Sequence, residues 1–332
     1  MKNDVLELRQ EGVFCPAGDF FIDPRGKVER AVITHAHSDH GRPGHSSYLC
    51  SETCENLLKI RIGRDALIES LPFGEKIKIG DAFVSFHPAG HILGSAQIRV
   101  EVKGQVWVVS GDYKPQADQT CEPFELMKCH GYVSECTFGL PVYRWLPEQT
   151  IHHEINTWWS QNAQDERVSL LFAYSLGKAQ RVLAGLDETL GEIFVHSAVF
   201  PFLEHYRKAG ARIPEVQKIE RGKEYDYQKA IVIAPPAVED STWTRKFRNA
   251  KKGFASGWMA IRGARRRRNL DRGFVLSDHA DWDGLINVIK GTGAEEVKVT
   301  HGNGDALTRY LQEDGINCSV LAGAGLRGEE EE

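Results

Sequence analysis

The stretch from His35 to His40, His-Ala-His-Ser-Asp-His, constrains this chain more than any other. It directly follows an apolar run, Ala31 to Thr34, of the kind that forms a buried strand. On an extended segment alternate side chains share a face, so His35, His37 and Asp39 should point one way, and a turn is needed to bring His40 round to them. Imidazole and carboxylate groups together suit zinc, with manganese or iron as alternatives. The spacing therefore predicts a metal site at the end of a strand.

Two simpler interpretations of this stretch are a polar surface loop and a purely structural zinc site. Binding residues are commonly built where strands end, and the density of ligands here argues against a chance loop. A structural zinc more often recruits cysteine, and no cysteine lies close to this stretch. A catalytic metal is favoured, and six residues are too few to close the site, so further ligands must come from elsewhere in the chain.

The length and composition fit one large domain or two modest ones. The chain has 332 residues and 41% hydrophobic content, with no apolar stretch long enough to cross a bilayer and no signal-peptide pattern at its start. We therefore expect a cytoplasmic protein with no membrane partner. The 7 cysteines include no CxxC pair, which favours reduced thiols, with Cys50 and Cys54 as a weak alternative metal pair.

A strongly basic segment stands out against the net charge of −5. Between Arg245 and Arg272 the basic residues face a single acid, Asp271. Such a segment is typical of a surface that binds phosphates, although a solvated loop explains the charge equally well. The candidate contacts are Arg265, Arg266, Arg267 and Arg268. Ser175 and Lys178, where a strand feeds a helix, form a second candidate phosphate site, with an ordinary capped helix as the alternative.

Further candidate ligands end other expected strands. His91 lies in a glycine-flanked turn, Asp112 ends a strand, and His279 and His301 each follow a later one. From about residue 140 helices and strands alternate, which indicates an inserted α/β unit with a parallel sheet.

These motifs, together with Asp23 upstream, resemble the metallo-β-lactamase fold. Glu135, His279 and His301 are similar to the three additional motifs of its β-CASP nuclease branch, and the segments Tyr174 to Leu183 and Ala255 to Trp258 most resemble the bacterial ligase-associated DNA exonucleases. The resemblance implies an α/β (α+β) protein. Residues 1–140 and 273–326 are expected to form an αββα sandwich, residues 141–272 an inserted β-CASP cap, and residues 327–332 an acidic tail.

The resemblance also implies the roles of individual residues. One divalent ion, zinc with manganese as the alternative, is expected at His35, His37, His91 and Asp112. A second is expected at Asp39, His40, Asp112 and His301, with Asp112 shared. Asp23 is expected to orient a ligand by hydrogen bonding, and Asp39 is counted with the catalytic groups as well as with the ligands.

The expected reaction is phosphodiester hydrolysis by a metal-activated water, with His279 protonating the leaving oxygen and Glu135 holding its ring. DNA is the expected substrate, in repair or end processing, and an ATP-dependent DNA ligase and a helicase are expected partners by resemblance alone. His301 is typical of RNA-cleaving members, so an RNA endo- or exonuclease of the ribonuclease J or cleavage-and-polyadenylation type is the main alternative. A small-molecule hydrolase such as a lactamase or thioesterase, and a non-catalytic binding subunit, are weaker ones.

Overall fold

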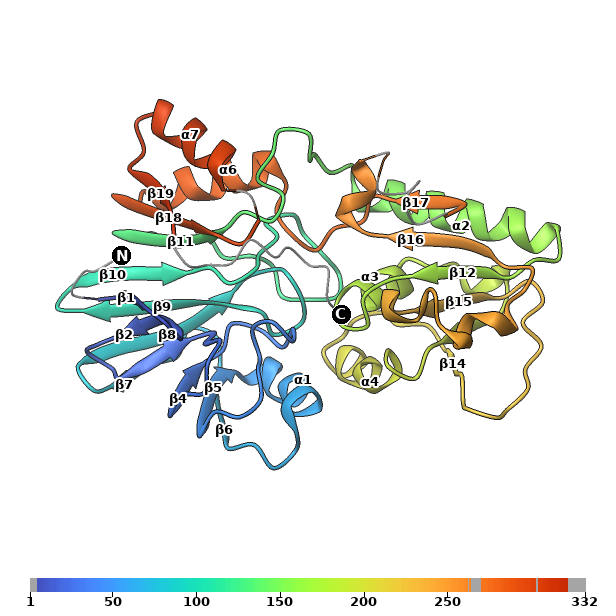
Figure 1. Cartoon of the computed structure of the whole chain (residues 1–332), viewed down its shortest axis with the longest axis horizontal. Coiled ribbons are helices and arrows are strands. Elements are labelled where there is room, and N and C mark those ends of the chain that lie inside the picture. Colours follow the sequence, from blue (N-terminus) through green and yellow to red (C-terminus); the bar gives the residue numbers. More distant parts are fainter. Residues whose placement is uncertain (1–4, 262, 264–269, 303, 322–332) are drawn as a thin grey trace. The chain divides into compact units, whose positions relative to one another are not determined.

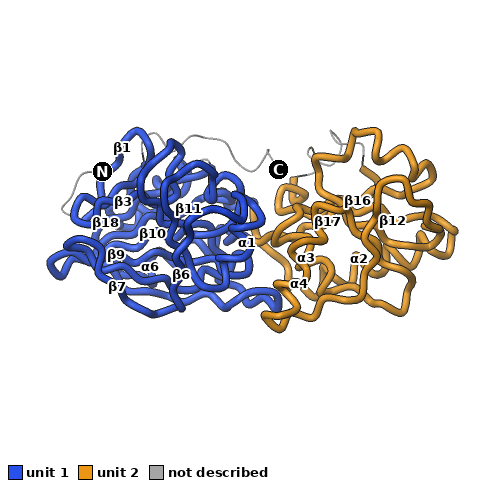
Figure 2. Tube along the Cα trace, turned by 90° about the horizontal axis from the view of Figure 1, so that it is seen from below, with its two compact units in different colours: residues 1–142, 279–328 blue, residues 143–278, 329–332 orange. Residues whose placement is uncertain are grey.

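The computed structural model describes residues 5–261, 263, 270–302 and 304–321. These residues form two compact units, shown in blue and orange in Figure 2. Unit 1 takes the chain up to residue 142 and again from residue 279, and unit 2 takes residues 143–278. The sequence predicted an insertion that begins at residue 141 and ends at residue 272. The end of unit 2 lies later because Ser277 and Asp278 are held by unit 2, where Arg181 Nη1 donates to the Ser277 carbonyl at 2.8 Å.

Unit 1 contains two sheets (Figure 1). The first consists, in spatial order, of β1 (Glu7–Arg9), β2 (Gly12–Cys15), β3 (Phe20–Ile22), β4 (Arg30–Val32), β5 (Ser47–Ser51) and β6 (Ile68–Leu71). The second consists of β19 (Cys318–Val320), β18 (Glu296–Thr300), β11 (Gly131–Glu135), β10 (Gln105–Val109), β9 (Ala96–Val102), β8 (Ala82–Pro88) and β7 (Lys76–Ile79).

The two sheets pack face to face, as the alternation of side chains along the strands requires. In β10, Trp107 and Val109 point into the core shared with the first sheet, next to residues such as Val13 and Ile22. The intervening residue Val108 points to the other face, where it packs against helices. This period of two places one apolar layer on each side of the second sheet.

Helices cover the outer faces of both sheets. α6 (Trp282–Thr292) and α7 (Asp305–Glu313) contribute to the apolar cluster on the outer face of the second sheet. α1 (Glu52–Ile62) lies against β5 and β6 of the first sheet, and Ser51 caps it by accepting a hydrogen bond from the Cys54 N–H at 3.3 Å. Unit 1 is thus an αββα sandwich, as the sequence predicts.

Unit 2 is built on one parallel sheet, which confirms the α/β alternation expected from the sequence. Its strands, in spatial order, are β14 (Gln217–Lys218), β13 (Ile193–Val195), β15 (Ile231–Ala234), β12 (Ser169–Phe172), β16 (Lys251–Ala255) and β17 (Arg272–Phe274). Its α-helices include α2 (Glu148–Gln164), α3 (Lys178–Ala184) and α4 (Phe200–Lys208). No helix in the described part of the chain is both long and apolar enough to cross a membrane.

Candidate metal centre

The candidate site lies in unit 1 where several strands end at the same edge of the sandwich. β10, β11 and β18 are neighbours and run parallel, so their carboxyl ends meet there. These ends carry Asp112, Glu135 and His301 respectively. His91 follows β8 in the same sheet, and the His35 to His40 segment follows β4 in the opposite sheet. Loops far apart in the sequence therefore deliver their polar side chains to one place.

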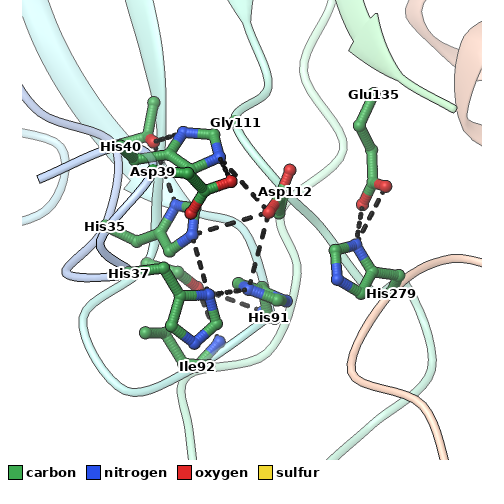
Figure 3. Close-up of polar contacts among 12 residues, drawn as sticks. His35, His37, Asp39, His40, His91, Ile92, Gly111, Asp112, Glu135 and His279 are labelled. Carbon is green, nitrogen blue, oxygen red and sulfur yellow. Dashed lines mark hydrogen bonds and ion pairs between the residues drawn. The ribbon is translucent and has the colours of Figure 1, made fainter. Parts of the chain in front are cut away.

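A first cluster consists of His35, His37, His91 and Asp112, which offer ligand atoms within 4.8 Å of one another (Figure 3). His37 Nδ1 lies 3.1 Å from both His35 Nε2 and His91 Nε2. Asp112 Oδ2 lies 3.5 Å from His35 Nε2 and 3.8 Å from His91 Nε2. Burial, followed by the neighbouring His40 and His91, lowers the pKa of His35 well below its usual value. His35 is therefore neutral, which is the form of imidazole that binds a metal.

A second cluster consists of Asp39, His40 and His301. His40 Nε2 lies 3.6 Å from Asp39 Oδ2 and 3.4 Å from Asp112 Oδ2, and the His40 and His301 rings stack with centroids 5.1 Å apart. Asp112 therefore faces both clusters. It can be shared between two ions.

Buried polar atoms in both clusters lack hydrogen-bond partners among the described residues. They are His40 Nε2, Asp112 Oδ1 and His301 Nδ1. Such orphaned atoms are costly in a folded protein unless something else satisfies them. Divalent ions satisfy imidazole nitrogens and carboxylate oxygens of this kind, so the residues present fit a metal centre.

The charges in the clusters compensate one another when no ion is present. Burial lowers the pKa of His40, but Asp39, Asp112 and Asp23 outweigh it and raise that pKa well above its usual value. Burial raises the pKa of Asp112, but His40 and then His279 hold it well below its usual value. A proton on His40 thus supplies positive charge between the neighbouring carboxylates. Metal binding at this cluster must release that proton.

Asp23 orients His40. Its Oδ2 accepts a hydrogen bond from His40 Nδ1 at 2.8 Å, which turns Nε2 toward the second cluster. Thr34 holds Asp23 in turn, because its N–H donates to Oδ1 at 2.8 Å and its hydroxyl donates to Oδ2 at 2.5 Å. Thr34 was not predicted from the sequence, although its position between the strand and the His35 to His40 segment was a usable signal.

We expect Asp23→Asn to weaken metal binding at the second cluster by about 10- to 100-fold, as loss of a residue that orients a ligand usually does. Asp23 has a left-handed backbone, φ 42°, which asparagine tolerates, so the change tests the charge and hydrogen bond rather than the turn. Calorimetric titration of metal-free protein measures the effect. Asp81→Asn is the matched control, because the Asp81 side chain is 90% exposed. Equal affinities in the two variants would contradict the role given to Asp23.

Glu135 and His279 form a buried pair beside the first cluster, at the right of Figure 3. His279 Nδ1 lies 3.0 Å and 2.9 Å from the two Glu135 oxygens. Glu135 also accepts hydrogen bonds from the N–H groups of Tyr113 at 2.8 Å and Thr137 at 3.3 Å. The carboxylate is thereby fixed from several sides, and it fixes the imidazole in turn.

The other predicted residues either belong to unit 2 or lie outside the described residues. Arg265, Arg266, Arg267 and Arg268 lie outside the described residues. In unit 2, Lys178 is 1% exposed and forms a close ion pair with Asp278, an arrangement that does not favour a phosphate contact. Ser175 does not cap α3, because the residue at the N-cap position of this helix is Gly177. The Gly177 N–H donates a hydrogen bond to Gln180 Oε1 at 2.7 Å. Contacts within unit 2 hold this strand-to-helix turn, and phosphate binding at Ser175 and Lys178 stays a prediction.

Comparison with known proteins identifies relatives that match all or part of this chain. The chain is 30% identical to a protein described as a probable DNA ligase from Opitutus terrae, over 93% of this chain and 30% of that protein. It is 30% identical to endoribonuclease YSH1 from Eremothecium gossypii, over 36% of this chain and 16% of the relative. It is 25% identical to an RNase J-like protein from Methanocaldococcus jannaschii, over 47% and 42% respectively. The chain thus spans less than half the length of each of these relatives.

YSH1 and RNase J proteins have the metallo-β-lactamase fold with the β-CASP insertion, and the sheets and the inserted unit found here match it. This chain has the same fold. The relatives point to the β-CASP nucleases. A solved structure of a protein of unknown function from Enterococcus faecalis is similar with a TM-score of 0.57 at 11% identity, over 81% of this chain and 74% of that one. No protein-family model matches the chain.

Proposed function

We propose that this chain is a metal-dependent phosphodiesterase that acts as a DNA exonuclease in repair or end processing. The observation that carries the proposal is the pair of ligand clusters that face Asp112 from two sides, with a histidine acid candidate beside them. Two divalent ions, for which imidazole and carboxylate ligands favour zinc with manganese as the alternative, would lower the pKa of a bound water and neutralise the attacked phosphate.

The chain's own residues supply the proton transfer. Glu135 occupies Nδ1 of His279, so Nε2 is the ring atom that can deliver a proton to the leaving sugar oxygen. Asp39 is 54% exposed, which places a carboxylate on the solvent side of the second cluster. In the balanced reaction a water oxygen joins phosphorus and the water gives up one proton, the bond from phosphorus to the sugar oxygen breaks, and that oxygen takes a proton from His279.

We expect His279→Asn to lower the rate of DNA hydrolysis by about 10²- to 10⁴-fold, the usual contribution of a general acid. Metal content should stay at the wild-type level. The 4-nitrophenyl ester of thymidine 5′-phosphate has a leaving group that needs no proton, so its hydrolysis should fall much less. Equal losses on both substrates would contradict the assignment of His279 as the acid.

DNA is preferred as substrate because a relative that matches 93% of this chain is described as a probable DNA ligase. The same match supports a DNA ligase as a working partner. The matching region makes up 30% of a longer chain that is described as a probable DNA ligase. A helicase partner rests on the subfamily resemblance alone. A nuclease that works with these partners on chromosomal DNA would act in the cytoplasm.

RNA cleavage is the second candidate. His301 occupies the position where RNA-cleaving members carry histidine, and the endoribonuclease and RNase J-like relatives support the same alternative. End-labelled single-stranded DNA and matching RNA, with and without a 5′ phosphate, distinguish the two in zinc or manganese. Faster loss of DNA, absent from the Asp39→Ala/His40→Ala double variant, is expected. Preferential cleavage of RNA would overturn the choice of DNA.

A further inference from the structure

The turn that carries His91 packs directly against the start of α1, within unit 1. Gly94 in this turn has a left-handed backbone, φ 74°, and a Cβ atom placed on it would lie 2.4 Å from the Cys54 nitrogen in the first turn of the helix. A glycine is needed for the two backbones to come so close. The turn follows β8 of the second sheet, whereas α1 follows β5 of the first, so this contact links the two sides of the sandwich.

Hydrogen bonds inside the turn connect Gly94 and its neighbour to His91. Ser95 Oγ accepts hydrogen bonds from the His91 N–H at 3.1 Å and from the Ile92 N–H at 3.2 Å. The Ser95 N–H donates to the Ile92 carbonyl at 2.9 Å, and the Ser95 carbonyl accepts from the Ala89 N–H at 3.0 Å. His91 is fully buried and has little room to compensate for a shifted backbone. A displacement at Gly94 therefore reaches the ligand.

Glu122 holds this turn against the helix from a third segment of the chain. Its Oε2 accepts a hydrogen bond from the Gly94 N–H at 2.9 Å, and its Oε1 accepts one from the Thr53 hydroxyl at 2.8 Å. Thr53 lies in the first turn of α1, where the helix dipole favours a negative charge. Glu122 is partly exposed, so its replacement leaves no buried charge behind.

We propose that Glu122 is a positioning residue for the first cluster, because it fixes Gly94 to α1 and thereby holds His91 where it can bind a metal ion. Glu122 is not among the candidate ligands in the described part of the chain, so its effect passes through the turn. Residues that orient metal ligands contribute to affinity although they do not touch the ion. The proposal rests on the metal centre of the proposed function, but not on the choice between DNA and RNA.

The test measures zinc binding at the first cluster alone, in the Asp39→Ala/His40→Ala background that removes ligands of the second cluster. Competition between the metal-free protein and a chromophoric chelator gives the affinity. Glu122→Ala should weaken zinc binding by about 10-fold, the lower end of the usual effect of a residue that orients a ligand. Glu122→Gln should stay close to the starting affinity, because its amide oxygen can still accept a hydrogen bond from the Gly94 N–H.

Glu125→Ala is the matched control from the same segment. The Glu125 side chain is 52% exposed, and its Oε2 lies 3.1 Å from His87 Nδ1 rather than at the turn that carries His91. Its replacement should leave zinc affinity unchanged. The visible absorption of cobalt(II) bound at the first cluster reports the geometry of the ligands, and it should change in Glu122→Ala but not in Glu125→Ala.

Thr53→Val tests whether the link to α1 runs through Glu122. This variant removes the hydroxyl that orients the carboxylate, so it should weaken zinc binding in the same direction as Glu122→Ala but less. In a chain that already carries Glu122→Ala, the same change should have no further effect, because its partner is gone.

Equal zinc affinities in Glu122→Ala and Glu125→Ala would overturn the assignment. So would a Glu122→Gln chain as weak as Glu122→Ala, or effects of Thr53→Val and Glu122→Ala that simply add. Thermal unfolding midpoints verify that each variant is folded, and the comparison of Thr53→Val with Glu125→Ala decides the test if Glu122→Ala is not. A chain with all its ligands that binds no zinc would contradict the metal centre itself, and with it both the proposed function and this assignment.

Discussion

Replacing Asp112 with alanine is expected to lower phosphodiesterase activity by about 10⁴-fold, because ions at such a centre contribute several kcal/mol to transition-state stabilisation and about 1.4 kcal/mol corresponds to a factor of ten. Asp112 is the one residue whose carboxylate faces both described clusters, within 3.5 Å of His35 Nε2 and 3.4 Å of His40 Nε2. Its loss therefore impairs both ion positions at once.

The measurement combines the metal content of the purified variant with its rate on labelled DNA. Asp81→Ala, which removes a carboxylate that is 90% exposed, serves as the control and should keep both values. The unfolding midpoint of Asp112→Ala distinguishes loss of metal from loss of fold. A folded Asp112→Ala protein with two ions and near-normal activity would contradict the shared-ligand assignment.

The second large effect is on stability and lies in unit 2. We expect Lys178→Met to lower the free energy of unfolding by about 3–5 kcal/mol, the usual cost of removing one partner from a buried ion pair. Lys178 and Asp278 are 1% and 2% exposed, so the carboxylate that loses its lysine stays out of water. Converting Asp278 to leucine in the same protein removes that charge and should recover much of the loss.

Lys208→Met is the control for this change. Lys208 pairs with Glu204 at 2.7 Å, but the two side chains are 70% and 72% exposed, and such pairs contribute about 0–1 kcal/mol. Urea unfolding of the single and double variants gives the comparison. A Lys178→Met protein as stable as Lys208→Met would show that the buried pair contributes little.

Much of the fold could be predicted from the sequence because the apolar patterns were unambiguous. The strand-rich first part, the helix after Ser51 and the parallel sheet of unit 2 all follow from periodicity and capping signals. The end of unit 2 was predicted too early, since nothing in the residues before His279 signals that Asp278 pairs with Lys178 about a hundred positions upstream. Long-range ion pairs of this kind leave no local pattern.

The clustering of the candidate metal ligands was predictable for a related reason. Histidines and aspartates at strand ends are rare unless they share a site, so their positions indicated the cluster before its geometry was known. Lys178 shows the limit of such inference, because a lysine at a strand-to-helix turn has the same local sequence whether it binds phosphate or an internal carboxylate. The link from Glu122 to Gly94 was missed altogether, since the two residues belong to separate loops and neither stands in a recognisable pattern.

The most direct test of the central claim is the activity of metal-free protein as zinc or manganese is added stepwise. We expect no cleavage of labelled DNA or RNA without metal, a rise in the cleavage rate with added ion, and a plateau at two ions per chain. The Asp39→Ala/His40→Ala variant should bind one ion fewer and stay inactive. Full cleavage in the presence of a chelator, or a cleavage rate that is already maximal in metal-free protein, would contradict a metal-dependent phosphodiesterase.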